Sequence, residues 1–435
     1  MNDIRAFRGL RFDETVVGPI GKVVCPPYDV ISAVDQINLY GRSPFNAVRL
    51  ELGLEFPEDD ASNNRYTRAA RTLEDWLARH AVRPDGEPCI YLYEQCFQFD
   101  GRTLTRRGLL ANLRLAPWEE GVVLPHEETM AKPKADRLEL MRTTACHLSP
   151  IFLLFDDPSG EVSRLMASVA TEPPTVVADT EDGQTHRLWV LPARDHEDLL
   201  SALRTPQLYV ADGHHRYETE LAYRDERRAL APSDPPDAPY NFGMMLLVDA
   251  RDPGLVVLPT HRMVRGVDPA LLGMLEGALS GSFEIERVPV DGADAATIAR
   301  ELLRRVSDLG QQGPALGFYR SDPGGAVVLR LRDPEKAMAS RSGPLLDVDV
   351  LQDLLLAPLL GIGPEQLSAG THVTYSRDAV EAVGAVEKGS AQAAFLLNPT
   401  PVEQVLQTAR AGGKMPQKST YFYPKPVTGL VISRV

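Results

Sequence analysis

A strand, a sharp turn and a helix follow one another at residues 208–228, and this order constrains the fold of the chain most. Residues 208–211 are an apolar run typical of a buried strand, and residues 221–228 are typical of a helix. Between them lie Asp212, Gly213, His214, His215 and Arg216. A helix that begins at such a turn has backbone N–H groups without intrahelical partners, and its positive dipole end favours an anion. Two imidazoles and a guanidinium at this turn therefore predict a phosphate or carboxylate site.

The same residues also have a purely structural interpretation. Asp212 can cap the helix, and His214 and His215 can be hydrogen-bonded packing residues. We favour the anion site, because a structural cap needs only one of these residues.

The length and composition are those of an ordinary soluble globular protein. The chain has 435 residues, of which 43% are hydrophobic and 24% are charged. Its first residues lack the apolar core of a signal peptide, and no run approaches the roughly eighteen apolar residues that span a membrane. We therefore expect a cytoplasmic protein without a membrane partner.

Charge and motif content argue against several common functions. The net charge of −14 opposes binding to nucleic acid, and the 4 cysteines are scattered without the spacing of a zinc site. The chain has no GxxxxGK[ST] loop, no strand-borne GxGxxG, no GxSxG and no HExxH. Any nucleotide must therefore be held by a different device.

Strands and helices that do not alternate strictly predict an α+β (mixed α/β) fold. We expect one part over residues 1–230, a proline-rich loop at 231–240 and a second part over 241–435. Strands are expected at 90–99 and 103–111, joined by a turn at Asp100 and Gly101, and at 150–155, 242–248, 255–259, 316–320, 326–332 and 393–397. Helices are expected at 62–79 with Ser62 as cap, at 137–144, 269–279, 295–309 and 348–356, and after Thr400, which forms a capping box with Glu403.

A carboxylate follows two prolines near the N-terminus. Pro26 and Pro27 stiffen an extended approach, after which Tyr28 and Asp29 lie where a helix could begin. Asp29 is either a helix cap or a carboxylate held on a rigid turn, suited to act as a general base or metal ligand.

Residues 126–137 combine both signs of charge at high density. His126, Glu127 and Glu128 precede a predicted helix that begins at Arg137. Such a run is either a solvated surface or a loop that binds a charged substrate together with Mg²⁺.

Two further segments pair cations with hydroxyl or imidazole groups. His261 and Arg262 follow a strand, and Lys418, Ser419 and Thr420 lie in a stretch rich in lysine and aromatic residues. The second segment is either a terminal strand with solvated lysines or a grip for a phosphate or carboxylate.

The chain resembles the bacterial and archaeal family called "domain of unknown function 1015" from Phe12 to Val431. The motifs that carry the resemblance occur in the expected order: Pro26-Pro27-Tyr28-Asp29-Val30-Ile31, Pro125-His126-Glu127 with Asp136-Arg137, Ser149-Pro150-Ile151-Phe152, Ala211-Asp212-Gly213-His214-His215-Arg216-Tyr217-Glu218, Leu258-Pro259-Thr260-His261-Arg262 and Met415-Pro416-Gln417-Lys418-Ser419-Thr420. The family name itself implies no activity.

The loop at residues 213–217 resembles the phosphate loops of sulfiredoxin and ParB proteins, and most closely the Asp-Gly-His-His-Arg loop of free-serine kinases. The resemblance implies a ParB/sulfiredoxin-like core with large insertions and an additional α/β subdomain. His214 stands where sulfiredoxin has its reactive cysteine, so repair of sulfinic acids by that route is excluded. The DNA-binding helices of ParB are missing as well.

The kinase resemblance implies transfer of phosphate from ATP or ADP, with Mg²⁺, to the hydroxyl of a serine-like amino acid or hydroxy acid. The implied roles are catalysis, nucleotide binding, substrate binding and metal binding. The implied catalytic residues are Asp29 and His215, and the implied nucleotide-binding residues are Asp212, Gly213, His214, His215 and Arg216. The implied substrate-binding residues are His126, Glu127, Arg137, His261, Arg262, Lys418, Ser419 and Thr420. The implied metal ligands are Asp212, Glu127 and Glu128. The alternative is a regulatory or scaffold protein that binds or hydrolyses nucleotide without a metabolite acceptor.

Overall fold

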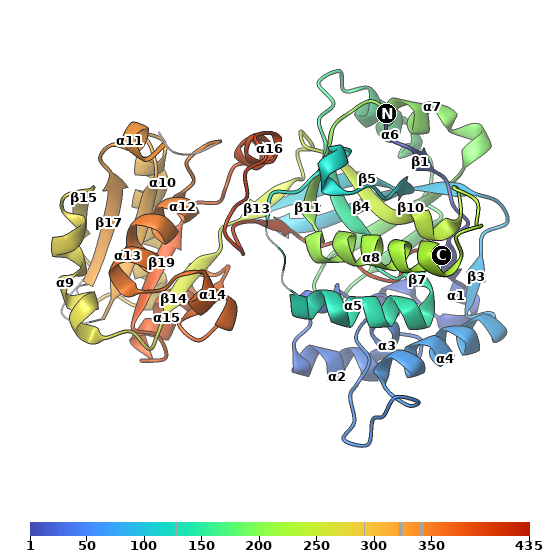
Figure 1. The fold of residues 1–435 in the computed structure, drawn as a ribbon, viewed down its shortest axis with the longest axis horizontal. Helices are drawn as coiled ribbons and strands as arrows, with labels where there is room; N and C mark the ends of the chain where they lie inside the picture. The colour runs from blue at the N-terminus through green and yellow to red at the C-terminus, as the bar shows by residue number, and fades with distance from the viewer. Residues whose placement is uncertain (128, 130, 291, 322–324, 339–342) are drawn as a thin grey trace. The chain divides into compact units, whose positions relative to one another are not determined.

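The chain divides into two compact units (Figure 1). A computed structural model describes residues 1–127, 129, 131–290, 292–321, 325–338 and 343–435. Unit 1 consists of Met1–Pro125, Thr129–Val256 and Pro424–Val435, and unit 2 of His126–Glu128 and Val257–Tyr423.

Unit 1 is built on a mixed sheet that has nine strands in the described residues. The strand order is β6-β11-β8-β12-β5-β4-β10-β9, and β1 also pairs with β5. The pairs β6–β11 and β8–β12 are parallel, whereas the other pairs are antiparallel. The strands are β1 (Ile4–Arg5), β4 (Cys89–Phe99), β5 (Arg102–Arg114), β6 (Val123–Leu124), β8 (Ile151–Phe155), β9 (Val176–Asp179), β10 (Thr185–Pro192), β11 (Leu208–Asp212) and β12 (Phe242–Asp249). Two small antiparallel pairs join β2 (Leu10–Phe12) to β3 (Val82–Pro84) and β7 (Cys146–His147) to β21 (Ser433–Arg434).

The hairpin between β4 and β5 turns where the sequence predicts it. Asp100 and Gly101 have φ values of 49° and 71°. Two consecutive residues with positive φ match the twist of the flanking strands, and this conformation favours Asp followed by Gly. The predicted turn is therefore confirmed.

The helices of unit 1 pack around this sheet, and α8, α5 and α4 lie side by side (Figure 1). The helices are α1 (Glu14–Val17), α2 (Ala33–Arg42), α3 (Val48–Glu51), α4 (Arg65–Ala78), α5 (Ala131–Thr144), α6 (Glu161–Val169), α7 (Glu197–Ala202) and α8 (His214–Leu230). Short 3-10 turns are η1 (Ile20–Lys22), η2 (Tyr28–Val30), η3 (Trp118–Glu120), η4 (Ala193–Asp195) and η5 (Pro239–Asn241).

The start of α4 corrects the sequence prediction. Asn64, not Ser62, caps the helix, and its side chain accepts from the backbone N–H groups of Tyr66 and Thr67. Ser62 instead donates its hydroxyl to Asp60 at 2.8 Å. The polar loop before the helix offers several capping side chains, and the choice depends on the path of that loop.

An aromatic contact fixes the first turn of α8 in the core of unit 1. Tyr217 is fully buried, stacks on Trp118 with ring centroids 4.3 Å apart, and donates its hydroxyl to the carbonyl of Ala116 at 2.9 Å. The hydroxyl would be costly to bury without a partner, so this bond sets both the depth and the rotation of the helix.

Unit 2 contains a six-stranded antiparallel sheet of order β15-β17-β16-β19-β14-β18, as far as its residues are described. Its strands are β14 (His261–Val264), β15 (Phe283–Val288), β16 (Ala315–Arg320), β17 (Gly325–Leu331), β18 (Val373–Ser376) and β19 (Ala393–Leu397), and β13 (Val256–Leu258) pairs with β20 (Tyr421–Tyr423). The helices are α9 (Pro269–Leu279), α10 (Ala295–Gly310), α11 (Pro334–Met338), α12 (Asp347–Leu351), a π-helical turn η6 (Gln352–Leu356), α13 (Ala357–Leu360), α14 (Pro364–Ala369), α15 (Ala379–Glu387) and α16 (Val402–Arg410).

Both faces of this sheet are buried, which explains its apolar strands. Phe318 and Val327 belong to the cluster that contains α9 and α12 side chains, whereas the next residues in sequence, Tyr319 and Val328, belong to the cluster of α10 and α15. Because side chains alternate across a strand, each strand fills two cores. The mixed α/β fold class expected from the sequence is confirmed.

The start of α16 differs from the capping box predicted there. The N-cap position is held by Pro401, which makes no side-chain cap. Thr400 donates its hydroxyl to the carbonyl of Ser419 at 3.3 Å, so a contact with a distant segment replaces the local one. Gly412, with φ of 67°, follows the end of the helix as predicted.

The compact units are divided differently from the expected parts. The proline-rich loop at 231–240 lies within unit 1, because the strand that follows it, β12, pairs with both β8 and β5 in the centre of the sheet. The chain passes to unit 2 after Val256 and returns at Pro424. No helix in the described residues is long and apolar enough to cross a membrane.

Candidate functional site

The junction between β11 and α8 depends on a glycine. Gly213 has φ of 99° and occupies the N-cap position of α8. A Cβ added there would lie 3.1 Å from Nε and Nη2 of Arg216, so the guanidinium folds back against the glycine backbone. Gly213 therefore serves both the left-handed turn and the close approach of Arg216.

Asp212 is an ion-pair partner in this structure. Its Oδ1 lies 2.7 Å from Nζ of Lys425, and its Oδ2 lies 2.6 Å from Nη2 of Arg216. Burial alone would raise the pKa of Asp212, but the two cations outweigh it and hold this pKa well below its usual range. Asp212 is thus an ionised carboxylate at the head of α8.

Lys425 joins the N-terminal carboxylate to this loop. Its Nζ donates to Oδ2 of Asp29 as well as to Asp212, and its side chain is only 7% exposed. Burial favours the neutral amine, but the two carboxylates outweigh burial and raise the pKa of Lys425 above its ordinary value. Asp29, in η2, is 29% exposed and can still be reached from solvent. Three segments that are far apart in the sequence therefore meet in one charged cluster.

The backbone around Lys425 is fixed by buried side chains of the sheet. Arg106 donates to the carbonyl of Pro424 at 2.5 Å, and Gln95 donates to the carbonyl of Lys425 at 3.2 Å. Sequence reasoning chose Lys418 from this stretch and missed Lys425. The available signal was its position between Pro424 and Pro426, since two prolines stiffen the backbone around a single cation.

Arg216 is held on several sides. Its Nη1 donates to the carbonyl of Pro150 at 2.6 Å and to Oγ of Ser149 at 3.2 Å. Burial would lower the pKa of Arg216, but nearby carboxylates, Asp212 first among them, raise it instead. The guanidinium is therefore a fixed positive charge beside the head of α8.

The two histidines of the loop differ in burial. His214 is buried, whereas His215 is half-buried and its carbonyl accepts a hydrogen bond from Thr219 at 2.8 Å. Both belong to the first turn of α8, beside Gly213.

Arg137 lies beneath the turn that carries Asp29. Its guanidinium lies 4.1 Å from the ring centroid of Tyr28, and its Nη1 donates to the carbonyl of Glu51 at 2.8 Å. The structure thus places this predicted substrate residue beside the Asp29 turn, with its side chain 7% exposed.

The other predicted substrate residues gather in unit 2. His126 Nε2 lies 3.1 Å from Oγ1 of Thr420, and the carboxylate of Glu127 accepts from the backbone N–H of Lys418 at 3.2 Å. Arg262 donates to the carbonyl of Lys418 at 3.2 Å. The structure therefore brings these residues together as one cluster.

Burial lowers the pKa of two residues of that cluster, and hydrogen bonds to the backbone hold two of its side chains. Burial lowers the pKa of Arg262 to about 10, and it lowers the pKa of His261 to about 4, with the Arg262 charge as a second cause. His261 is therefore neutral near pH 7, and its Nδ1 accepts from the N–H of Leu397 at 3.2 Å. Ser419 donates its hydroxyl to the carbonyl of Pro416.

The predicted magnesium ligands do not form a cation site by themselves. Each carboxylate oxygen of Asp212 faces a cation, and Glu127 already accepts from a backbone N–H. Glu128 lies outside the described residues. Within the described part of the chain, no group of three or more His, Cys, Asp or Glu side chains could hold a metal ion. In this arrangement Asp212 and Glu127 therefore do not fit a bound Mg²⁺ ion.

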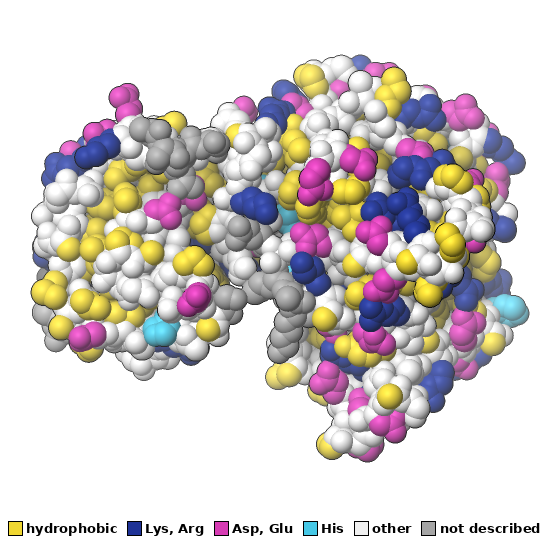
Figure 2. All heavy atoms as spheres, viewed as in Figure 1, with side chains coloured by type: hydrophobic (Ala, Val, Ile, Leu, Met, Phe, Trp, Pro, Cys, Tyr) yellow, Lys and Arg dark blue, Asp and Glu magenta, His cyan; other side chains and the backbone are white. Residues whose placement is uncertain are grey.

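The molecular surface mixes the two signs of charge. On the face of unit 1 in Figure 2, basic and acidic side chains are interspersed among the described residues. Asp29, Asp212, Arg216 and Lys425 of this unit form an ion-pair cluster in which Asp29 remains 29% exposed.

The chain belongs to the family described as "Protein of unknown function (DUF1015)", whose sequence profile matches residues 4–349. The family resemblance seen in the sequence is thereby confirmed. A search of curated proteins found no match.

Several solved structures are similar at low sequence identity. A conserved hypothetical protein from Pyrococcus furiosus is 12% identical, covering 75% of this chain and 94% of that chain, with a TM-score of 0.36. A free serine kinase in complex with AMP is 12% identical, covering 72% of this chain and 86% of that chain, with a TM-score of 0.36. SbnI from Staphylococcus aureus, truncated at its C-terminus, is 10% identical, covering 73% and 85%, with a TM-score of 0.34. Similarity of this degree carries no argument about fold or activity.

Proposed function

We propose that this protein is a small-molecule kinase that transfers phosphate from ATP or ADP to the hydroxyl of a serine-like amino acid or hydroxy acid. The observation that carries the proposal is the ion-pair cluster in which Lys425 joins Asp29 to Asp212. Phosphoryl transfer needs an anion cradle beside a group that accepts the proton of the attacking hydroxyl. The cluster provides a candidate for each.

The cradle is the start of α8. Backbone N–H groups at the head of this helix, its dipole, and the charges of Arg216 and Lys425 favour phosphate oxygens. His214 and His215 belong to the same turn, and we assign His215 the task of stabilising charge that develops on the transferred phosphate. Fixed cations stabilise that charge at little reorganisation cost.

Asp29 is the proposed general base. Its carboxylate takes the proton of the substrate hydroxyl while the hydroxyl oxygen bonds to the terminal phosphorus, and the bond to the leaving nucleotide oxygen breaks. Lys425 contacts Asp29 through Oδ2, so in this proposal nucleotide phosphate competes with Asp29 for the ammonium group. Competition of this kind would free the carboxylate when nucleotide is bound.

We also propose that the cluster in unit 2 binds the carboxylate of the acceptor. The cations of Arg262 and Lys418 and the hydroxyl of Thr420 are suited to this task. A Thr420→Val variant is then expected to raise KM for the acceptor with little change in KM for the nucleotide. ATP, ADP and small hydroxylated metabolites are cytoplasmic compounds, in keeping with the expected location.

The direct test is transfer of label from radioactive ATP or ADP to serine, threonine or glycerate, with Mg²⁺ or with EDTA. We expect wild-type protein to label an acceptor, and Asp29→Asn to bind nucleotide but lose turnover by about a hundredfold or more. The matched control is Asp237→Asn, an exposed carboxylate of unit 1, which is expected to act like wild type. Nucleotide binding without transfer to any acceptor would contradict the kinase and favour the regulatory alternative.

A further inference from the structure

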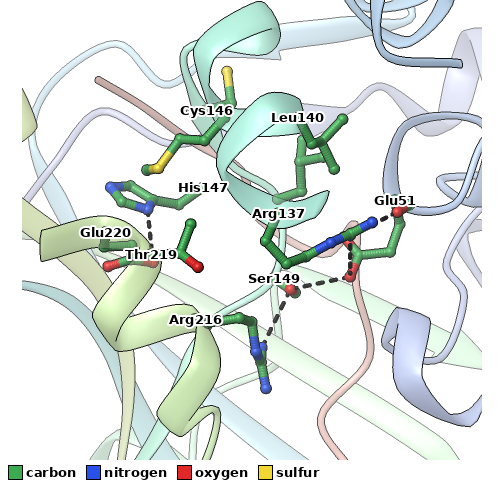
Figure 3. Close-up of a pocket in the computed structure, with 11 residues that line it drawn as sticks. Glu51, Arg137, Leu140, Cys146, His147, Ser149, Arg216, Thr219 and Glu220 are labelled. Atoms are coloured by element: carbon green, nitrogen blue, oxygen red, sulfur yellow. Dashed lines mark hydrogen bonds and ion pairs between the residues drawn. The ribbon is translucent and has the colours of Figure 1, made fainter. Parts of the chain in front are cut away.

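A buried carboxylate that was not among the predicted site residues lies between the turn that carries Asp29 and the residues that hold Arg216. Glu51 is the last residue of α3 and is 2% exposed. It lines a cavity of about 50 Å³ together with Arg137, Ser149, Arg216 and Glu220 (Figure 3). Nothing in the sequence distinguished it from an ordinary charge at the end of a helix.

One oxygen of Glu51 accepts hydrogen bonds both from the turn that carries Asp29 and from Ser149, which contacts Arg216. Its Oε1 accepts from the backbone N–H of Tyr28 at 3.3 Å and from Oγ of Ser149 at 3.3 Å. The Tyr28 bond fixes the turn whose next residue is Asp29. The Ser149 hydroxyl, in turn, accepts from Nη1 of Arg216 at 3.2 Å.

The direction of these bonds makes an ordered chain. The guanidinium of Arg216 can only donate, so the Ser149 hydroxyl accepts from it and turns its own proton toward Glu51. An ionised carboxylate can only accept, which suits both donors that face Oε1. The Coulombic attraction of Glu51 also contributes to the raised pKa of Arg216.

Arg137 completes the surroundings of the carboxylate. Its Nη1 lies 3.9 Å from Oε1 of Glu51, while its guanidinium packs on the ring of Tyr28. Glu51 therefore compensates buried positive charge and orders the Tyr28 turn at the same time. A carboxylate that is this well buried is costly unless it is paired, and Glu51 is paired with Tyr28, Ser149 and Arg137.

We propose that Glu51 is a positioning residue for the transfer reaction, holding the Asp29 turn and the Arg216 guanidinium in register through Tyr28 and Ser149. The proposal rests on the kinase function proposed above. In this proposal Glu51 acts through Tyr28 and Ser149, so its effect falls on the alignment of base and phosphate rather than on binding alone.

Glu220 provides a matched control within the same cavity. It is 5% exposed and its Oε1 lies 2.9 Å from Nδ1 of His147, on the side of the cavity opposite Glu51 (Figure 3). Replacing either glutamate by alanine removes a buried carboxylate from the lining of the same cavity. A general effect on folding would therefore appear in both variants.

The kinetic test compares Glu51→Ala, Glu51→Gln and Glu220→Ala in the full chain. We expect Glu51→Ala to lower kcat by about a hundredfold with KM for nucleotide changed less than about threefold. Glu51→Gln keeps an oxygen that can accept both bonds and is expected to recover most of this loss, whereas Glu220→Ala stays near wild type. Equal losses of kcat in Glu51→Ala and Glu220→Ala would overturn the proposal.

Amide hydrogen exchange tests the positioning independently of turnover. Exchange in residues 28–31 is expected to rise in Glu51→Ala and to stay unchanged in Glu220→Ala; unchanged exchange in both would overturn the role of Glu51. If wild type transfers no phosphate, the kinase proposal fails while this measurement still decides whether Glu51 orders the turn. Should Glu51→Ala fail to fold, Glu51→Gln and Ser149→Ala, which interrupts the same chain at one hydroxyl, are compared with wild type in the same two ways.

Discussion

At the scale of single residues, Lys425 determines the electrostatics of the candidate site. Asp29 and Asp212 are carboxylates that contact the same ammonium group, and Arg216 supplies a second cation to Asp212. Two carboxylates so close together repel each other unless a cation lies between them. The lysine thus holds together two segments whose sequence separation from it is 396 and 213 residues.

Replacing Lys425 by methionine is expected to destabilise unit 1. The free energy of unfolding at pH 7 should fall by about 3 kcal/mol, because the substitution removes the buried ammonium group that Asp29 and Asp212 share. Denaturant unfolding measures the change. Lys22→Met, at an exposed lysine of the same unit, is the control and should be nearly neutral.

The destabilisation by Lys425→Met should depend on pH in a defined direction. The pKa of an aspartate in an unfolded chain is about 4, and the pKa of Asp212 in the folded protein is lower. The ion pairs of Asp212 therefore stabilise the fold above about pH 4, and this contribution disappears as Asp212 is protonated at lower pH. The pKa of Lys425 is raised, so its contribution persists at neutral pH and disappears only as strong alkali removes its proton. The difference between wild type and Lys425→Met should therefore be constant from about pH 5 to 9 and narrow in acid. A difference that grows in acid would contradict this account.

The sequence predicted the loop and Asp29, which the structure brings together, but it did not predict their partners. Residues 212–216 carry a local signal, since a glycine turn before a helix limits what they can do. Lys425 has only the local signal of its two flanking prolines and Glu51 has none, because their roles arise from contacts between remote segments. Asp212 had two local interpretations; in the structure Gly213 holds the N-cap position of α8, and the Asp212 carboxylate pairs with Arg216 and Lys425.

At the scale of elements, α8 and β12 approach each other through a glycine. A Cβ at Gly243 in β12 would lie 2.0 Å from Oε2 of Glu220 in α8, 2.8 Å from Met245 and 3.0 Å from Leu115. The absence of a side chain there allows α8, which carries the proposed phosphate cradle, to lie against the central strand.

Gly243→Ala is expected to lower the free energy of unfolding by about 2 kcal/mol, because the added methyl group overpacks this contact. Thermal and denaturant unfolding measure the effect. Gly86→Ala is the control, since a Cβ at Gly86 meets nothing within 4 Å. Equal stability of the two variants would show that α8 can shift away from β12 without cost.

Local signals predicted elements well where the chain itself makes the decisive contacts. The turn residues Asp100 and Gly101 predict the β4–β5 turn, and a proline at the first helical position predicts helix α9. A short apolar run predicts strand β19. The predicted caps at Ser62 and Thr400 were wrong because other side chains or segments compete for the same groups. Helix ends are decided by such competition, which a linear pattern does not contain.

At the scale of the whole molecule, each unit contains a buried neutral histidine. Burial lowers the pKa of His186 in unit 1 and of His261 in unit 2 to about 4 in each case. His186 Nδ1 lies 2.8 Å from the hydroxyl of Tyr93, and His261 Nδ1 accepts from a backbone N–H. Protonation of His261 Nδ1 would remove the lone pair that accepts this N–H.

Both units are therefore expected to lose stability between about pH 6.5 and pH 4. In this range His186 and His261 bind protons in the unfolded chain but not in the folded units. Each of these two histidines lowers the free energy of unfolding by about 3 kcal/mol when the effect is complete. NMR titration of the imidazole C2 protons checks this, since neither signal should move above about pH 5, whereas free histidine titrates near 6.5. A midpoint above pH 6 for either residue would contradict the account.

The central claim is that the cluster of Asp29, Asp212, Arg216 and Lys425 binds nucleotide phosphate. Calorimetric titration of the full chain with ADP, in wild type, Lys425→Met and Lys22→Met, tests it most directly. We expect wild type and Lys22→Met to bind with equal affinity and Lys425→Met to bind at least about tenfold more weakly, the effect of losing one charge-assisted contact. No binding of ADP to wild type, or equal binding to all three proteins, would contradict it.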